Sequence, residues 1–217
     1  MTLTEDAEVL WRTATALARA ATAVSPPDRP EGRLLPPLLF FTDPARTPRP
    51  WETAARLPTG AAVVYRHFGA LRALETGLRL RAATKAAGVR LLVGLDADLA
   101  DRIDADGVHL PERALSAAYA LSGRRPDWLL TGAAHSMHAV KDARDLNALV
   151  LSPVFPAGGV SATRAALGIE GFEALAAVAP CPVYALGGIC AANAAALIES
   201  GAYGIAGVEA VQNAFRA

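Results

Sequence analysis

Cysteine is scarce in this sequence, and so are the long apolar runs and basic leader segments that mark membrane or exported proteins. Cys181 and Cys190 are the two cysteines, too few for a disulfide framework, which favours a reduced, cytoplasmic protein. No apolar run approaches the roughly 18 residues that a membrane span needs. Glu5, Asp6 and Glu8 stand where a signal peptide would be basic. We therefore expect neither export nor a membrane partner.

An excess of charge of either sign is also missing. Lys plus Arg number 21 and Asp plus Glu number 21, so no overall field attracts nucleic acid. What the chain does have is apolar residues, at 53% of 217, which can fill a substantial core. We expect one α/β domain and no nucleic-acid partner.

The first 37 residues differ in character from the rest. Residues 3–23 place Leu10, Ala14 and Leu17 on one face at helical spacing, which predicts an amphipathic helix. Residues 25–37 then hold five prolines, a composition that resists both helix and central strand. We divide the chain into an N-terminal helix with a Pro-rich linker, 1–37, and a main domain, 38–217. The helix either packs on that domain or contacts a neighbouring subunit in a homo-oligomer.

From Leu38 onward, short apolar runs alternate with longer segments rich in Ala, Leu and Arg. The expected strands are 38–42, 61–66, 90–94, 107–110, 128–132, 148–152, 183–186 and 204–206. The expected helices are 51–56, 71–87, 97–103, 114–121, 137–146, 171–178, 191–200 and one from about 208. Continuous apolar strands between helices indicate a parallel sheet covered on both faces. A doubly wound open sheet shows similar periodicity, but eight such units favour a (β/α)8 TIM barrel with an N-terminal helical extension.

Glycines follow the last two expected strands. Gly187 and Gly188 end the seventh strand, and Gly207 and Val208 follow the eighth. Glycine lets backbone N–H groups approach a phosphate closely, and a following helix would add a favourable dipole. In a barrel the site lies at the C-terminal strand ends, with phosphate often bound after strands seven and eight. These four residues are therefore candidates for phosphate binding.

Residues 149–168, LVLSPVFPAGGVSATRAALG, begin as a buried strand and continue as a long loop of small and polar residues. Loops of this length in a compact domain are usually lids or ligand-binding segments. Ser161 and Arg164 are its candidates for contact with a phosphorylated ligand.

Five motifs in order carry a family resemblance. They are ADGVHL (105–110), SPVFP (152–156), ALG (166–168), ALGGI (185–189) and GAYG (201–204). Over about residues 38–211 the chain resembles the thiamine phosphate synthase superfamily. That resemblance implies a (β/α)8 barrel that binds phosphorylated thiamine precursors. Its members include the synthase, which joins a pyrimidine diphosphate to a thiazole phosphate using Mg²⁺, and the related thiazole tautomerase.

The chain departs from the synthase pattern at the positions that hold pyrophosphate and metal. Where the synthase has Gln-x-Arg-x-Lys after strand two, only Arg66 remains. Gly94-Leu95 replaces an Asn-Asp pair, and the second metal-binding aspartate falls at about Ala114. Residues 157–160 stand in place of the family's Thr-x-Thr-Lys run. We expect no metal and no other cofactor.

The synthase alternative stays open, because Mg²⁺ needs oxygen ligands and nearby carboxylates remain. If synthase activity is retained, Asp96 or Asp98 would recruit the metal.

The resemblance to the tautomerase assigns catalysis to His135, in the Ala134-His135-Ser136 stretch after the fifth strand. A proton shift on a formed ring calls for a group that titrates near neutrality, and histidine suits that task. His67 and His109 end neighbouring strands and would share the task or orient the ligand. Arg66 would hold a phosphate or carboxylate in a two-pronged contact.

Glu209 is the awkward residue, since its carboxylate would repel a phosphate after strand eight. Either it turns outward, it pairs with Arg66 or Arg164, or the phosphate site is degraded.

The preferred function is binding of a phosphorylated thiazole with isomerisation by His135. The alternatives are thiamine phosphate synthase with Mg²⁺, and a non-catalytic protein that binds a thiamine precursor.

Overall fold

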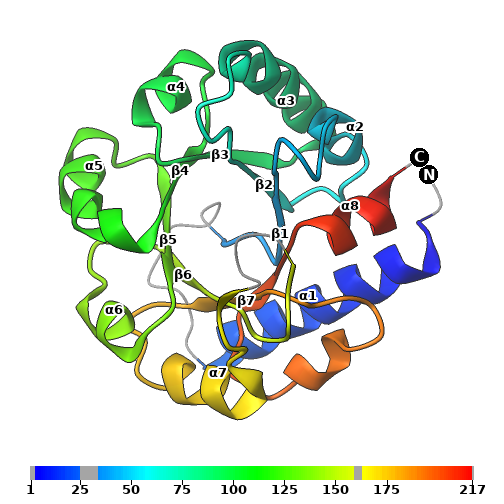
Figure 1. The fold of residues 1–217 in the computed structure, drawn as a ribbon, viewed down its shortest axis with the longest axis vertical. Coiled ribbons are helices and arrows are strands. Elements are labelled where there is room, and N and C mark those ends of the chain that lie inside the picture. Colours follow the sequence, from blue (N-terminus) through cyan, green and yellow to red (C-terminus); the bar gives the residue numbers. More distant parts are fainter. Residues whose placement is uncertain (1–2, 25–33, 159–162, 217) are drawn as a thin grey trace.

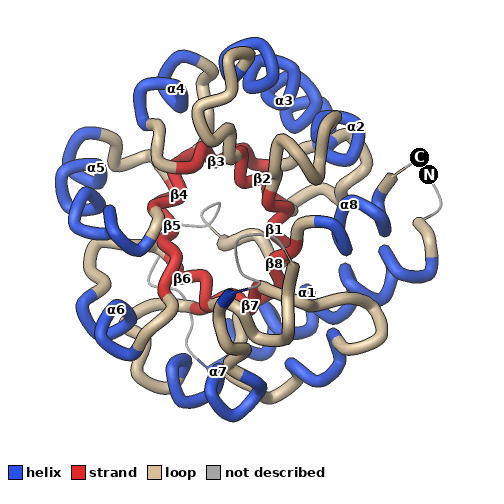
Figure 2. Tube along the Cα trace, viewed as in Figure 1, coloured by secondary structure: helices blue, strands red, loops and turns tan. Residues whose placement is uncertain are grey.

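The computed structural model describes residues 3–24, 34–158 and 163–216. Eight parallel strands close into a barrel in sequence order, and β1 pairs with β8 (Figures 1 and 2). The strands are β1 (Leu38–Phe41), β2 (Ala62–Tyr65), β3 (Arg90–Gly94), β4 (Gly107–Leu110), β5 (Leu129–Ala134), β6 (Ala148–Leu151), β7 (Val183–Leu186) and β8 (Gly204–Gly207). The predicted barrel is confirmed, and the open doubly wound sheet is excluded.

Side chains alternate between the inside of the barrel and the surrounding helices, as the two-residue period of a strand requires. In β2, Val64 belongs to the inner cluster with Phe41 and Tyr184, whereas Val63 and Tyr65 belong to the outer cluster beneath the helices. Both clusters are apolar, which explains why the strand sequences are continuously hydrophobic rather than alternating.

Helices form the outer ring in Figure 1. They are α1 (Glu5–Val24), α2 (Pro50–Ala54), α3 (Ala73–Ala87), α4 (Ala97–Arg102), α5 (Ala118–Arg124), α6 (Met137–Asp142), α7 (Gly168–Ala176) and α8 (Glu209–Phe215), with 3₁₀ turns η1 (Glu112–Ala117) and η3 (Ala194–Leu197). The helix expected at 114–121 is divided between η1 and α5, and α7 begins three residues earlier than expected.

The helix predicted at 191–200 is wrong, because only the short η3 forms there. The backbone ends that turn before residue 200, since Ile198 is extended, with φ −62° and ψ 131°, and Glu199 has φ +71°. The Asn193 side chain closes the preceding turn, because its Oδ1 accepts the Cys190 N–H and its Nδ2 donates to the Gly188 carbonyl. No α-helix therefore follows Gly188, and the helix dipole predicted for the phosphate cradle is absent.

The N-terminal helix α1 is part of the helical ring. It contacts β8, α8 and η3, and it buries Leu10, Ala14 and Leu17. In Figure 1 it runs beside α8. It therefore covers the part of the barrel that the short η3 leaves uncovered. Packing on the barrel thus accounts for its apolar face, whereas an oligomer contact and the boundary at residue 37 stay predictions.

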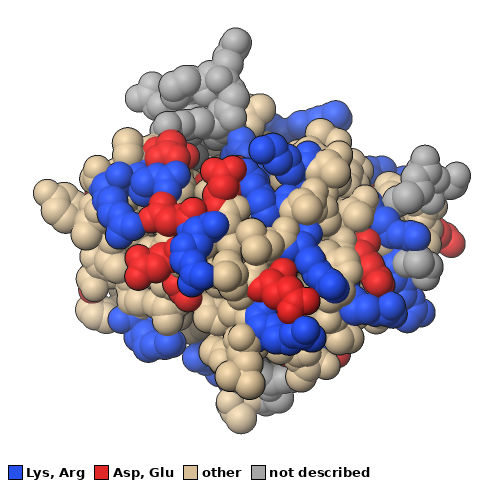
Figure 3. Space-filling view, turned by 90° about the horizontal axis from the view of Figure 1, so that it is seen from above, with Lys and Arg blue, Asp and Glu red and all other residues tan. Residues whose placement is uncertain are grey.

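Charged side chains are interspersed by sign on the face shown in Figure 3. That distribution fits the formal net charge of zero and gives no single-sign surface on this face. Among the described residues, no helix is long and apolar enough to cross a membrane.

Candidate functional site

Arg66 stands at the C-terminal mouth of the barrel, directly after β2. By the alternation of the strand it faces inward, on the side of Val64. Its Nε donates to the Thr42 carbonyl at 2.8 Å, and its guanidinium carbon lies 5.2 Å from the Phe41 ring centre and 5.3 Å from that of Phe68. The guanidinium is thus fixed in place by one hydrogen bond and two cation–π contacts.

The charge of Arg66 has no ion-pair partner among the described residues. Burial lowers the pKa of Arg66 to about 10, with Asp43 opposing that shift and Arg46 adding to it. Even at this pKa the group is a cation at neutral pH. A partly buried cation without a carboxylate is costly, and an anionic ligand would offset that cost.

A cavity of about 240 Å³ opens beside Arg66, at the C-terminal ends of β1, β7 and β8. Its lining combines two arginines, two carboxylates and the predicted glycine segments. The lining residues are Asp43, Arg46, Arg66, Pro156, Ala157, Gly158, Leu186, Gly187, Gly188, Ile189, Cys190, Ala206, Gly207, Val208, Glu209 and Ala210. The structure therefore brings Arg66 together with the four residues predicted for phosphate binding.

Gly187 and Gly188 have a packing role as well. Both have positive φ, +103° and +65°, which favours glycine. A Cβ on Gly187 would lie 2.7 Å from the Pro153 Cβ, and one on Gly188 would lie 2.5 Å from the Pro156 carbonyl oxygen. The SPVFP segment is held there because Phe155 N–H donates to the Gly187 carbonyl at 3.0 Å. The two glycines are what lets the loop after β6 approach the end of β7.

Glu209 pairs with Arg46, which is none of the three alternatives left open for it by the sequence. The Arg46 Nη2 lies 2.6 Å from the Glu209 Oε2. This hydrogen bond lowers the pKa of Glu209 and raises that of Arg46. The carboxylate at the cavity is thereby neutralised, so its presence does not by itself degrade an anion site.

His135 follows β5 and is held at both ring nitrogens. Its Nδ1 lies 2.7 Å from the Ser152 carbonyl, and its Nε2 lies 3.0 Å from the Arg164 Nη1. Arginine only donates, so Nε2 accepts and Nδ1 carries the proton that the carbonyl accepts. These partners specify the neutral Nδ1–H tautomer, with the Nε2 lone pair directed at a cation on the loop before α7.

Glu112 in η1 positions the same segment. Its Oε2 accepts the His135 backbone N–H at 2.7 Å, and its Oε1 accepts the Ser136 hydroxyl at 3.4 Å. Ser136 in turn caps α6 by accepting the Ala139 N–H. The turn that carries His135 is therefore fixed from both sides.

His109 lies deeper in the barrel and is buried. Its Nδ1 is 2.9 Å from the Thr131 hydroxyl, and its ring meets Phe41 edge-on at 4.9 Å. Burial, with the nearby Arg66 and His135, lowers its pKa to about 3. It is a neutral group beneath Arg66, and its predicted ligand contact stays a prediction.

The neutral state of His109 leads to a pH-dependent stability. Between about pH 3 and 6.5 the unfolded chain binds a proton at this site that the folded chain does not, so unfolding free energy rises with pH across that window. We expect the His109 contribution to make the protein about 2 kcal/mol less stable at pH 5 than at pH 7. Urea titrations of the wild type and His109→Gln at both pH values measure it. An unchanged pH dependence in the variant would contradict the assignment.

His67 is not brought toward His135. Its ring packs near Tyr65, at 5.8 Å between centres, and Tyr65 faces the helices. The His67 Nε2 lies 3.2 Å from Asp96 Oδ2, and its Nδ1 accepts the Gly69 N–H. Both ring nitrogens are thus occupied outside the barrel mouth. The predicted catalytic role of His67 is untested, and this geometry gives it no route to His135.

Asp96 is a carboxylate left open for the Mg²⁺ that the synthase resemblance implies, and both of its oxygens already have partners. Asp96 caps α4, since its Oδ1 accepts the Leu99 N–H at 2.8 Å, while its other oxygen faces His67. Within the described ranges, no three His, Cys, Asp or Glu side chains gather closely enough to hold a metal by themselves. Gly94 and Leu95 add no ligand side chain. Mg²⁺ commonly binds one or two carboxylates together with the phosphate oxygens of a substrate, so the expectation of no metal stays a prediction.

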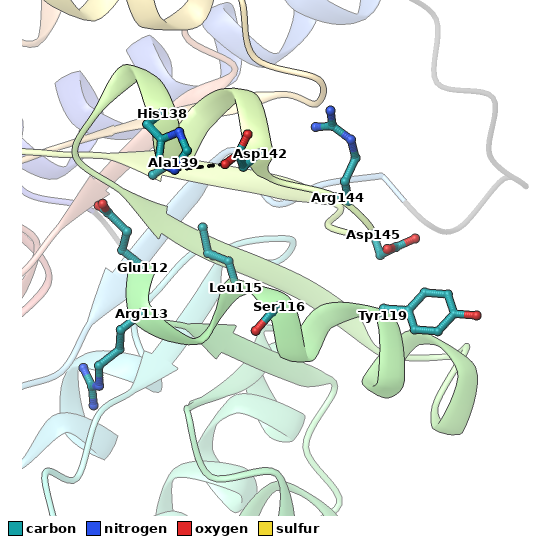
Figure 4. A pocket seen from close by; sticks show the side chains of 10 residues that line it. All are labelled: Glu112, Arg113, Leu115, Ser116, Tyr119, His138, Ala139, Asp142, Arg144 and Asp145. Carbon is teal, nitrogen blue, oxygen red and sulfur yellow. Dashed lines mark ion pairs between the residues drawn. The ribbon is translucent and has the colours of Figure 1, made fainter.

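Two larger hollows lie away from the mouth. One of about 530 Å³, between η1, α5 and α6, is drawn in Figure 4, where His138 pairs with Asp142 at 3.1 Å. The other, of about 830 Å³, lies at the opposite end of the barrel between α1 and the starts of the strands. Neither is lined by Arg66 or by the glycines after β7 and β8, so the smaller cavity is the better candidate.

Sequence reasoning missed Arg46 and Glu112, and Ser161 lies outside the described residues. A signal for Arg46 was present, because Asp43-Pro44 directly after a strand end is typical of a tight turn that would place the next residues at the mouth. Asp43 does form that turn, with its Oδ1 accepting the Ala45 and Arg46 N–H groups.

Comparisons with known proteins point to one family. The family described as thiamine monophosphate synthase matches residues 43–211. A thiamine-phosphate synthase of Chloroflexus aurantiacus is 37% identical over 166 residues, 72% of this chain and 74% of that protein. One of Archaeoglobus fulgidus is 34% identical over 140 residues, 64% and 66% of the two chains. A solved thiamine phosphate pyrophosphorylase from Pyrococcus furiosus is similar with a TM-score of 0.68 and 25% identity, covering 82% of this chain and 91% of that one.

Proposed function

This chain belongs to the thiamine monophosphate synthase family, and on that premise we propose that it binds a phosphorylated thiazole at the barrel mouth and isomerises the ring by proton transfer through His135. The phosphate would lie in the cavity beside Arg66, and the thiazole ring would lie toward His135.

The phosphate position is supported by the unpaired charge of Arg66 and by the small cavity at the ends of β7 and β8. Phosphate matches the planar, forked donor set of a guanidinium. A single phosphate group and part of its ester chain fit a space of about 240 Å³.

The proton transfer is supported by a single observation, the His135 tautomer. The Ser152 carbonyl keeps the proton on Nδ1, and the Nε2 lone pair meets the exposed Arg164 at the mouth. When the Arg164 guanidinium turns to a ligand carboxylate, Nε2 is free to take a proton from one ring position. The same nitrogen then returns a proton to the conjugated position, so the ligand leaves with unchanged composition.

Thiamine phosphate synthesis is the second candidate, and the comparisons favour it. Two relatives, 37% and 34% identical, carry the name thiamine-phosphate synthase. The relatives' names thus support the synthase, while the side chains at the mouth support the isomerase. We place isomerisation first because Leu95 and Ala114 stand where the synthase pattern has its metal-binding aspartates, whereas His135 is present after β5.

The two reactions are separable in one assay series. Purified protein is given the non-aromatic thiazole carboxylate phosphate alone, or a thiazole phosphate with a pyrimidine diphosphate and Mg²⁺. The proposal expects aromatisation in the first and no thiamine phosphate in the second. Thiamine phosphate formation without aromatisation would make the synthase the better-supported function. Ligand binding with no turnover in either assay would support a non-catalytic protein that binds a thiamine precursor.

Arg66 is expected to supply much of the phosphate affinity. Replacing it by alanine removes a charge-assisted hydrogen bond, so binding of a thiazole phosphate should weaken by about 1–3 kcal/mol. Titration calorimetry with the phosphate and with the corresponding alcohol measures this. The alcohol serves as the control, because its binding should change little. An unaltered phosphate affinity would place the ligand elsewhere.

A further inference from the structure

Four charged side chains line the cavity, and they balance. Arg46 and Arg66 supply two positive charges, and Asp43 and Glu209 supply two negative ones. A phosphate dianion entering this cavity would meet no net positive charge while both carboxylates stay in place. A phosphate site therefore works better if one carboxylate leaves when the ligand arrives.

The two partners of the Arg46–Glu209 pair differ in exposure, and the backbone of Arg46 is anchored at the cavity. The Arg46 N–H donates within the Asp43 turn, and the Arg46 carbonyl accepts the Gln212 Nε2 at 3.1 Å. The Arg46 side chain is 25% exposed, whereas that of Glu209 is 53% exposed. A half-exposed carboxylate regains its hydration at low cost when it releases its partner.

We propose that Arg46 is a phosphate ligand of this site, and that Glu209 is the group it exchanges for the phosphate. This rests on the proposed function for the class of ligand, a phosphate monoester. In the empty site Glu209 holds the Arg46 guanidinium at the cavity wall. An incoming phosphate takes over the same donors, and Glu209 turns to solvent.

The exchange makes Glu209 a determinant of specificity. A ligand must outcompete a carboxylate that is already bound 2.6 Å from Arg46. A ligand carboxylate carries one negative charge, as Glu209 does, so Arg46 gains no charge interaction when the ligand replaces Glu209. A phosphate dianion offers more charge and can contact Arg46 and Arg66 together. The pair therefore favours phosphate esters over carboxylic acids of the same shape.

Binding of inorganic phosphate and of a thiazole phosphate to four variants tests the exchange. Arg46→Gln should weaken both by about 10-fold or more, the range of a charge-assisted hydrogen bond. Glu209→Gln should strengthen both by about five-fold, since it removes a competing surface ion pair. The matched control is Arg49→Gln, on the same loop, because Arg49 is 69% exposed and pairs with Glu52 outside the cavity. Acetate should compete better in Glu209→Gln than in the wild type.

The single Arg46 variant leaves the Glu209 carboxylate unpaired and could fold poorly for that reason. The double variant Arg46→Gln/Glu209→Gln leaves no unpaired carboxylate, and it too should bind phosphate more weakly than the wild type. Wild-type phosphate affinity in the Arg46 variants, weaker binding in Glu209→Gln, or no phosphate binding by the wild type would each overturn the exchange. Failure of the proposed function is a separate result. In that case inorganic phosphate binding responds as described, but no thiazole is turned over.

Discussion

Replacing His135 by alanine is expected to lower kcat for thiazole isomerisation by about 10²- to 10⁴-fold, the usual contribution of a positioned general base. The reason is that Nε2 is the only nitrogen of this ring free of a backbone partner. The measurement is the rate of aromatisation at saturating substrate, with KM determined in parallel. KM should change little, because the phosphate contacts lie in the separate cavity beside Arg66.

Two companion variants separate chemistry from structure. His135→Asn retains a donor for the Ser152 carbonyl and should be folded but as slow as the alanine variant. His138→Ala is the matched control, since that side chain is three residues on and 89% exposed. A wild-type kcat in His135→Ala would contradict the assignment of His135 as the general base.

Gly188→Ala is expected to destabilise the fold by about 2–5 kcal/mol. The new Cβ adds a left-handed backbone cost of about 1–2 kcal/mol and an overpacking cost of about 1–3 kcal/mol. Its close neighbours are the Pro156 carbonyl oxygen at 2.5 Å and the Phe155 Cβ at 2.7 Å. Relief of that clash moves the loop after β6, so phosphate binding should fall as well.

Gly168→Ala separates the two costs. Gly168 has φ +67°, close to the +65° of Gly188, but nothing lies within 4 Å of its would-be Cβ. We expect only the backbone cost there, about 1–2 kcal/mol. Urea unfolding of both variants gives the comparison. Equal destabilisation would mean that the loop yields freely to the Gly188 side chain and does not depend on the glycine.

The barrel was predictable because each strand is a short, continuous apolar run, and the 183–186 strand is found with the predicted bounds. The helix at 191–200 was not, because an alanine-rich composition does not show where the backbone leaves helical geometry. Ile198 is extended and Glu199 has a positive φ, so only η3 forms. Helix propensity summed over a window does not register such a local break.

The site was predictable where position after a strand sufficed, as for Arg66 and His135. The outward orientation of the His67 side chain was also predictable, because neighbouring residues of a strand face opposite sides and Arg66 faces inward. The Arg46–Glu209 contact joins residues 163 positions apart, and only the closed barrel brings β1 and β8 together. Long-range pairs of this kind are not encoded in local spacing.

The names of the relatives and the side chains at the mouth point to two reactions that share a ligand. Both use a phosphorylated thiazole, so the phosphate site proposed beside Arg66 would serve either one. They differ in the departing pyrophosphate, whose charge only the synthase reaction has to neutralise. His135 is accordingly the residue on which the isomerase interpretation depends.

The most direct test of metal-independent isomerisation at this mouth is an NMR time course of the non-aromatic thiazole carboxylate phosphate with wild-type protein in EDTA. We predict conversion to the aromatic isomer well above the buffer rate, and at the same rate when EDTA is replaced by Mg²⁺. No acceleration over buffer, or acceleration only with Mg²⁺, would contradict the account.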